Sequence, residues 1–395
     1  MENHTLITQT AEMFPWYHSL ANLRALTASA EPLLSELPFI TEAVLAEHYY
    51  HAENPHLADG LSYLTSGTSS HKRKRVFYSL RDQAAYKKQR LDIFRNFIGA
   101  GMLRGFSDIG TGHAADTAYE IFTSLGMLAM NIDFRSDIEE HVQSLNAFQP
   151  DVFFTMPAII NNLMKQPDLR IKPRKIILVG DVASRAWQKN VADFFSLKPG
   201  DILDIYGCIE IGAIAHFNHE LDAYELGANL RPEAVPALDI YPNSPRQSSP
   251  DILVLTSTTR EYFPALRYVT NDTIHGFETI VHAGRSKTIF HHCGGRFADA
   301  LKHGEKISLY DIDEAMGRFF PGKRYEVSDR EGILSIQIEQ AALDANAVTQ
   351  LKQYLLETNP EVEHMVASRL IGDIDVQPGR LSDAASTTYK RRYTA

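Results

Sequence analysis

Short apolar runs alternate with longer amphipathic stretches over much of the first half of the chain. The apolar runs predict strands, at 61–65, 128–132, 151–156, 175–180 and 201–207. The amphipathic stretches predict helices, at 81–98, 136–147, 158–166 and 184–196. The run IILV at 176–179 does not alternate, which is typical of a parallel strand buried on both faces. We therefore expect an α/β fold in which βα units build a mostly parallel sheet.

The pattern changes near residue 201 to shorter strands and turns, and this change predicts an added β-subdomain. Farther along, a compact order of helix, strand, strand, helix and strand follows, at 309–319, 324–328, 333–338, 346–357 and 364–370. We therefore expect a large N-terminal domain at 1–298 and a small, mobile α+β domain at 299–395.

The composition of the chain limits its possible size class, its partners and its cellular compartment. The 395 residues are enough for two domains with a sizeable core. The net charge of −10 provides no basic field for a polyanion, so nucleic acid is not expected as a partner. No apolar run reaches the about 18 residues that a membrane span needs, and the first residues lack the pattern of a signal peptide. With Cys208 and Cys293 as the only cysteines, the sequence favours a reduced, cytoplasmic protein.

A loop rich in hydroxyl groups and cations is the most informative segment. Residues 63–75 read YLTSGTSSHKRKR, so that small hydroxyl side chains surround Gly67 and basic residues follow. Glycine permits a close backbone approach, hydroxyl and N–H groups donate hydrogen bonds, and cations offset negative charge. Such a loop suits phosphate binding. A flexible surface turn beside a solvated run of charges is the alternative, because the complete Walker motif is absent.

Several further segments combine glycine or tyrosine with acidic or basic residues. They read VGDVAS at 179–184, DIYGCIE at 204–210, ALRYVTND at 265–272, GRFADALK at 295–302 and TTYKRR at 387–392. With the loop, and in this order, they resemble the motifs of the adenylate-forming enzymes, which include acyl- and aryl-CoA synthetases, luciferases and adenylation domains. The resemblance spans residues 63–392.

The resemblance implies roles for individual residues of this chain. The phosphates of ATP would bind at the loop residues Thr65, Ser66, Gly67, Thr68 and Ser69. Other nucleotide contacts are implied at Gly180, Asp181, Tyr206, Gly207 and Asp272. Among these, Tyr206 would stack on adenine and Asp272 would hold the ribose hydroxyls. Catalytic roles are implied for Lys390, for Arg296 and for Glu210, which would also hold Mg²⁺, and the hinge between the domains is implied at Asp299.

Some positions depart from the family's pattern. Ser70 stands in place of a glycine, and Ile209 stands in place of a threonine. No proline marks the loop cation, whose position is therefore open among Lys72, Arg73 and Lys74. These departures keep a non-catalytic adenylate-fold binding protein open as an alternative to an enzyme.

In the reaction of this family, the carboxylate of an acid attacks the α-phosphate of ATP. Two anions have to meet, so catalysis depends mainly on positioning and on charge neutralisation. Mg²⁺ at Glu210, the loop on the outer phosphates and the ammonium of Lys390 would neutralise this charge. A lysine on a mobile small domain can be delivered for one half-reaction and withdrawn for the next.

The short portion before the loop and the segment at 179–184 are similar to the phenylacetate-CoA ligase-like branch of the family. This branch includes an enzyme that activates 3,4-dihydroxybenzoate in the biosynthesis of the siderophore petrobactin. We therefore expect an aromatic acid as substrate and a phosphopantetheine thiol on a carrier protein as acceptor, with free CoA as the alternative. The candidate pocket residues, near strand ends, are His113 and Phe154. A kinase-like phosphotransferase is disfavoured because kinase and Walker motifs are absent.

Overall fold

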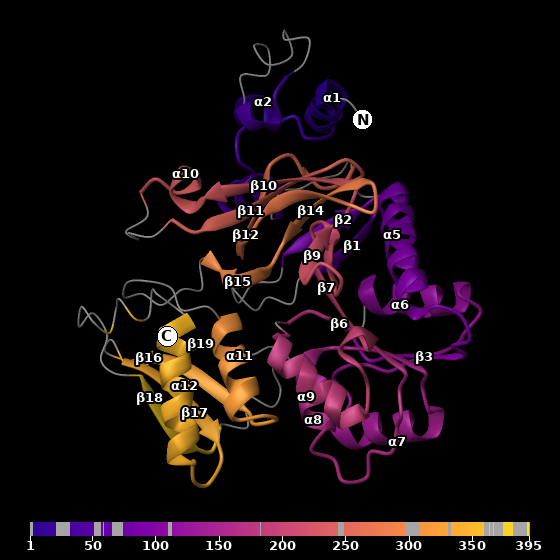
Figure 1. Ribbon diagram of the computed structural model, residues 1–395. Coiled ribbons are helices and arrows are strands. Elements are labelled where there is room, and N and C mark those ends of the chain that lie inside the picture. The colour runs from indigo at the N-terminus through magenta and orange to yellow at the C-terminus, as the bar shows by residue number, and fades with distance from the viewer. Residues whose placement is uncertain are drawn as a thin grey trace. The chain divides into compact units, whose positions relative to one another are not determined.

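The computed structural model describes most of the chain (Figure 1). The described residues are 3–20, 32–50, 57, 59–64, 74–109, 113–181, 183–243, 249–297, 309–330, 333–358, 363, 366, 374–381 and 393–394. The chain divides into two compact units. The first comprises Met1–Ile93, Tyr206–Ser244 and Ser249–His292, and the second comprises Phe94–Ile205, Pro245–Ser248 and Cys293–Ala395. Within the described ranges, none of the helices combines the length and apolar character that a membrane span requires.

The second unit contains most of the predicted parallel sheet, and the strand Ile202–Cys208 and the helix Leu80–Ile98 belong partly to the first unit. The strands of this sheet have the order β4-β3-β5-β6-β7, and each is parallel to its neighbour. They are β3 (Arg104–Ser107), β4 (Leu128–Asn131), β5 (Val152–Thr155), β6 (Lys175–Val179) and β7 (Ile202–Cys208). The accompanying helices are α5 (Leu80–Ile98), α6 (His113–Ser124), α7 (Ile138–Phe148), α8 (Pro157–Leu163), α9 (Arg185–Phe195) and the 3-10 turn η4 (Pro199–Asp201). The prediction that βα units build a parallel sheet is confirmed.

Helices cover both faces of this sheet. Apolar residues of α7, α8 and α9 pack with Phe153, Ile176 and Leu178 on one face. On the other face, the ring of Phe94 lies edge to face with the ring of Phe154, and the ring centroids are 5.2 Å apart. Because successive residues of a strand point to opposite faces, a strand that is covered twice must be apolar throughout. This double covering explains the run IILV in β6.

The first unit is built mainly from antiparallel strands, as expected for the added β-subdomain. One sheet includes β10 (Leu230–Pro236), β11 (Asp251–Ser257) and β12 (Tyr268–His275), in that order. Four further strands are neighbours in the order β13 (Glu278–His282), β14 (Arg285–Phe290), β9 (Ala223–Leu226) and β8 (Gly212–Asn218). The predicted phosphate loop connects two strands of a hairpin, β1 (Leu61–Leu64) and β2 (Arg75–Tyr78).

Short helices and turns complete the first unit. They are α1 (Asn3–Met13), α2 (Tyr17–Leu20), the 3-10 turn η1 (Leu34–Glu36), α4 (Glu42–Leu45), the π-helical turn η2 (Ala46–Tyr50) and α10 (Ala237–Ile240). Strand β15 (His292–Arg296) begins at the last residue of this unit and continues into the second. Thr41 precedes α4 as its N-cap, and its side chain accepts a hydrogen bond from the Val44 N–H.

The C-terminal part of the second unit is a small α+β layer. Helices α11 (Leu309–Phe319) and α12 (Ala345–Thr358) pack on a sheet of order β18-β17-β16-β19, from Asp375–Gly379, Ile333–Glu339, Tyr325–Arg330 and Tyr393–Thr394 (Figure 1). Leu334, Ile336 and Ile338 alternate along β17, so both helices cover the same face. The predicted helices and the first predicted strands agree with these bounds. The strand expected at 364–370 lies largely outside the described residues.

Gly105 in β3 is required by close packing inside the parallel sheet. A Cβ atom at this position would lie 2.4 Å from Cγ of the buried Phe122 ring. We expect Gly105→Ala to lower the free energy of unfolding by about 1–3 kcal/mol, because the core must shift to admit a methyl group. Chemical denaturation measures this loss.

The control for this substitution is Gly200→Ala in η4. A Cβ atom there meets no other atom within 4 Å, and the stability of this variant should stay close to that of the unsubstituted protein. Equal stability of the two variants would contradict the packing described for Phe122.

Candidate active site

The turn between β7 and β8 carries several of the residues that the sequence singled out. Tyr206 and Gly207 lie at the end of β7, and Glu210 lies in the turn with 8% of its surface exposed. A Cβ atom at Gly207 would lie only 2.5 Å from the carbonyl oxygen of Gly212. The tight approach of the two strands therefore requires glycine at position 207.

The structure brings Tyr206 together with Asp272, although 66 positions separate them in the sequence. The hydroxyl of Tyr206 donates a hydrogen bond of 2.5 Å to Oδ2 of Asp272. The preceding residue, Asn271, has a left-handed backbone with φ of 63°, and its side chain accepts a hydrogen bond from the hydroxyl of Tyr241. The left-handed backbone at Asn271 thus directly precedes the residue whose carboxylate accepts from Tyr206.

The backbone around Glu210 is held by buried side chains from two other segments. The hydroxyl of Tyr78 donates to the carbonyl oxygen of Ile209 at 2.5 Å. Nε of Arg260 donates to the carbonyl oxygen of Glu210 at 2.9 Å, and the guanidinium lies 3.9 Å from the centroid of the Tyr78 ring. Burial raises the pKa of Tyr78 well above its usual value, so its hydroxyl stays protonated and donates.

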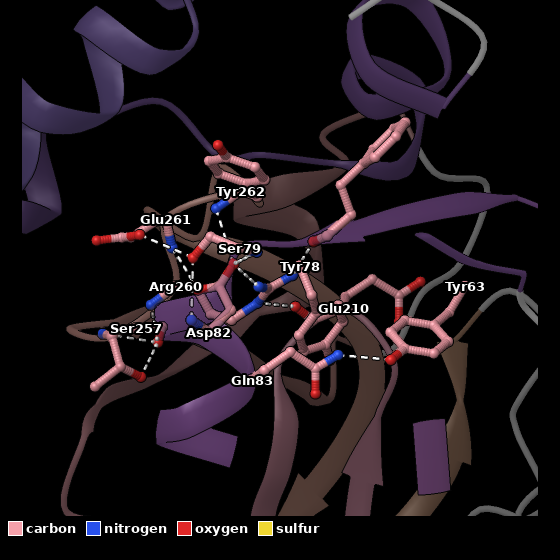
Figure 2. Close-up of polar contacts among 12 residues, drawn as sticks. Tyr63, Tyr78, Ser79, Asp82, Gln83, Glu210, Ser257, Arg260, Glu261 and Tyr262 are labelled. Atoms are coloured by element: carbon pink, nitrogen blue, oxygen red, sulfur yellow. Dashed lines mark hydrogen bonds and ion pairs between the residues drawn. The ribbon is translucent and has the colours of Figure 1, made fainter. Parts of the chain in front are cut away.

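A buried ion pair between Asp82 and Arg260 holds these segments (Figure 2). The two side chains are 0% and 3% exposed, respectively. The Asp82 carboxylate also accepts hydrogen bonds from the backbone N–H groups of Ser79, Glu261 and Tyr262. The guanidinium donates in addition to the carbonyl oxygen of Phe77, at 2.9 Å. Sequence analysis missed this pair, since its members lie far apart in the chain and belong to no recognised motif.

Lys74 is the one candidate loop cation among the described residues. Its ammonium forms an ion pair of 2.5 Å with Glu42 and lies 5.3 Å from the centroid of the Tyr50 ring. The hydroxyl of Tyr50 in turn donates to Oε1 of Glu210 at 3.3 Å. Tyr50 therefore contacts both Lys74 and Glu210, the acidic residue for which a magnesium-binding role was predicted. The other loop candidates are outside the described residues, namely Thr65, Ser66, Gly67, Thr68, Ser69, Lys72 and Arg73.

The remaining candidates lie in the second unit. Gly180 follows β6 with φ of 92°, a backbone conformation that favours glycine, and the half-buried Asp181 comes next. Phe154 is fully buried in the sheet core, and its predicted place in the substrate pocket stays a prediction. His113 begins α6 and Arg296 ends β15, but their side chains are outside what the structure describes. Asp299 and Lys390 are also outside the described residues.

The Glu210 carboxylate fits the demands of Mg²⁺ on a nucleotide. Magnesium ions in such sites bind through one or two carboxylates and the phosphates of the substrate, and keep several waters. Among the described residues there is no group of three or more histidine, cysteine, aspartate or glutamate side chains that could enclose a metal. The Glu210 carboxylate is a donor of the kind that a nucleotide-borne magnesium ion would use here.

Comparison with solved structures defines the fold family of the chain. The 2-hydroxyisobutyryl-CoA ligase, solved in the postadenylation state with an acyl-AMP, matches 99% of this chain and 87% of its own, with a TM-score of 0.73 and 15% identity. The amide bond synthetase McbA from Marinactinospora thermotolerans matches 84% of this chain and 66% of its own, with a TM-score of 0.55 and 14% identity. The chain thus has the fold of the adenylate-forming ligases, as the sequence motifs predicted.

Sequence comparison gives the family within this class. The fumarate–(S)-2,3-diaminopropanoate ligase of Enterobacter agglomerans is 46% identical over 380 residues, which are 96% of this chain and 95% of that protein. A family model described as the fumarate–diaminopropanoate ligase C-terminal domain matches residues 302–382. The chain belongs to the family of this ligase, and it is an adenylate-forming enzyme.

The buried ion pair gives a prediction for stability. Asp82→Asn leaves the charge of Arg260 buried without its partner, and we expect the free energy of unfolding to fall by about 3–5 kcal/mol. Thermal or chemical unfolding measures the change. Arg81→Ala is the control, because Arg81 pairs with Glu261 at 86% side-chain exposure and should contribute less than about 1 kcal/mol. Equal effects of the two substitutions would show that the Asp82 pair is not the anchor described here.

Proposed function

We propose that the protein activates a small dicarboxylic acid of the fumarate type with ATP and joins the acyl group to an amine. The observation that carries this proposal is the 46% identity to the fumarate–(S)-2,3-diaminopropanoate ligase over nearly the whole of both chains. The name of that relative specifies an acid and a diamine. Tyr206, Asp272 and Glu210 supply side chains of the kind that the first half of such a reaction needs.

The proposed reaction has two steps. In the first, a carboxylate oxygen of the acid attacks the α-phosphorus of ATP, the bond to the bridging oxygen breaks, and pyrophosphate leaves with an acyl-adenylate formed. In the second, the nitrogen of a neutral amine attacks the acyl carbon. AMP leaves, the nitrogen loses a proton, and an amide results. Neither step needs a nucleophile from the protein, so the site has to position reactants and balance charge.

The residues of the site take the following proposed roles. The ring of Tyr206 lies against adenine, and its hydroxyl orients Asp272, whose carboxylate accepts from the ribose hydroxyls. Glu210 holds the magnesium ion, which when bound offsets the charge of the phosphates. Gly180 and Asp181 contact the nucleotide from the end of β6. The hydrogen bond between Tyr206 and Asp272 supports this assignment, because it fixes the carboxylate before the nucleotide arrives.

The loop residues 65–69 and the C-terminal residues complete the proposed site. The loop cradles the outer phosphates, with Lys74 at its end as the cation that the described contacts favour. Lys390 reaches the reacting oxygens from a small domain at 299–395 with its hinge at Asp299, and Arg296 has a further catalytic role. The family model that starts at residue 302 supports a domain boundary at this place.

An aromatic acid passed to a phosphopantetheine thiol, on a carrier protein or on CoA, is the second candidate function. Its support is the resemblance of the segment at 179–184 to the phenylacetate-CoA ligase-like branch, together with the fold likeness to a CoA ligase. That likeness has 15% identity and concerns the fold, whereas the relative at 46% identity covers the whole chain. We therefore rank the aromatic acid, and a role in siderophore biosynthesis, below the dicarboxylic acid.

A test of the proposed function combines exchange of pyrophosphate into ATP with identification of the product. Exchange is measured with fumarate, succinate and 3,4-dihydroxybenzoate. Mass spectrometry then follows the product with diaminopropanoate or CoA. We expect exchange with fumarate, and AMP with an amide on addition of the diamine. Exchange with the aromatic acid alone would favour the second candidate. No exchange with fumarate or succinate would contradict the proposed acid.

Substitution of Asp272 tests its proposed contact with the ribose. Two hydrogen bonds to a charged acceptor contribute roughly 1.5–3 kcal/mol each, so Asp272→Ala should weaken ATP binding by about two orders of magnitude or more. Calorimetric titration measures the affinity, and the unfolding midpoint verifies the fold. Asp251→Ala, at an exposed position at the start of β11, is the matched control and should bind ATP normally. Normal affinity in Asp272→Ala would remove this residue from the site.

A further inference from the structure

Tyr50 lies at the end of a rare backbone element beside the candidate site. The turn η2 (Ala46–Tyr50) is π-helical and continues directly from α4. Single π-helical turns are uncommon and are frequently found at functional sites, where they change the direction of side chains. Here the turn presents two consecutive tyrosines, Tyr49 and Tyr50, of which 0% and 8% are exposed.

The hydroxyls of these two tyrosines have different partners. The Tyr49 hydroxyl accepts from the N–H of Phe77 and donates to the carbonyl oxygen of Tyr262, so it ties two backbone segments together. The Tyr50 hydroxyl instead donates to a side-chain oxygen, Oε1 of Glu210. Tyr49 therefore has a structural role, because its hydroxyl contacts only backbone groups in these two hydrogen bonds. Tyr50 instead contacts the carboxylate that is proposed to hold magnesium.

The contacts of Tyr50 define its role as a donor. An ionised carboxylate only accepts hydrogen bonds, so the Tyr50 hydroxyl is the donor toward Oε1 of Glu210. The ammonium of Lys74 lies over the ring, 5.3 Å from its centroid, and pairs with Glu42. The ring is thus held between a cation from the phosphate loop and the acidic turn of β7 and β8.

We infer that Tyr50 is a positioning residue that orients the Glu210 carboxylate for magnesium, an inference that rests on the proposed function of Glu210. Side chains that hydrogen-bond to a metal ligand fix its orientation, and their loss typically lowers metal affinity by 10–100-fold. The Tyr50 hydroxyl lies 3.3 Å from Oε1 of Glu210, at the long end for an O–H···O bond.

Tyr50→Phe tests this inference, because it removes the hydroxyl and keeps the ring over which Lys74 lies. The nucleotide is α,β-methylene-ATP, whose carbon bridge prevents adenylate formation, and calorimetry measures its binding with and without Mg²⁺. We expect the gain in affinity that Mg²⁺ provides to fall by about tenfold. Binding without the metal should be unchanged. Tyr49→Phe is the control: it should lower the unfolding midpoint and leave the gain from Mg²⁺ as it was.

Glu210→Gln separates the inference from the proposed function. A gain from Mg²⁺ that is lost in Glu210→Gln but kept in Tyr50→Phe would overturn the role of Tyr50 and leave that of Glu210 intact. A gain that both variants keep would overturn both roles. In the double variant, Tyr50→Phe should cause no loss beyond that of Glu210→Gln, since Tyr50 acts through this carboxylate. An additional loss of the gain from Mg²⁺ would contradict that route.

Discussion

The buried ion pair of Asp82 and Arg260 is the interaction on which the candidate site in the first unit depends. Removal of two charges from water costs several kcal/mol per ion, and the cost is offset only where hydrogen bonds satisfy the remaining atoms. Here backbone N–H groups surround the carboxylate, and carbonyl oxygens accept from the guanidinium. The pair therefore fixes three stretches of backbone that are distant in the sequence: 77–82, 257–262 and the turn at Glu210.

The backbone and the side chain of Glu210 are held by different groups. Arg260 and Tyr78 hold the carbonyl oxygens of the turn, so the position of the residue is set by groups that no ligand has to displace. Within the part of the chain that the structure describes, the carboxylate accepts a longer hydrogen bond from Tyr50. A backbone fixed in this way would suit the proposed metal ligand, because magnesium demands a near-ideal geometry.

Much of the fold could be predicted from the sequence because the spacing of apolar residues and the short motifs are both local features of the chain. The run IILV follows from a strand buried on two faces, and the glycine of Tyr206–Gly207 follows from the close approach of β8. The order of the motifs also indicated the class of enzyme. The partners that support these motifs had no such signal: Asp82 and Arg260 meet only through the topology, and Tyr50 depends on a π-helical turn that periodicity does not reveal.

The acid and the acceptor are harder to predict than the reaction class, and the reason is chemical. The proposed function assigns the recognised motifs to phosphates, ribose, adenine and magnesium, which adenylate formation requires whatever the acid is. None of these motif assignments concerns the acyl chain, so the expectation of an aromatic acid rested on the resemblance to one branch. The acceptor enters after pyrophosphate has left, and an amine or a thiol can attack the same acyl carbon. The adenylation site is therefore compatible with either, and the choice depends on what the protein places beside the finished adenylate.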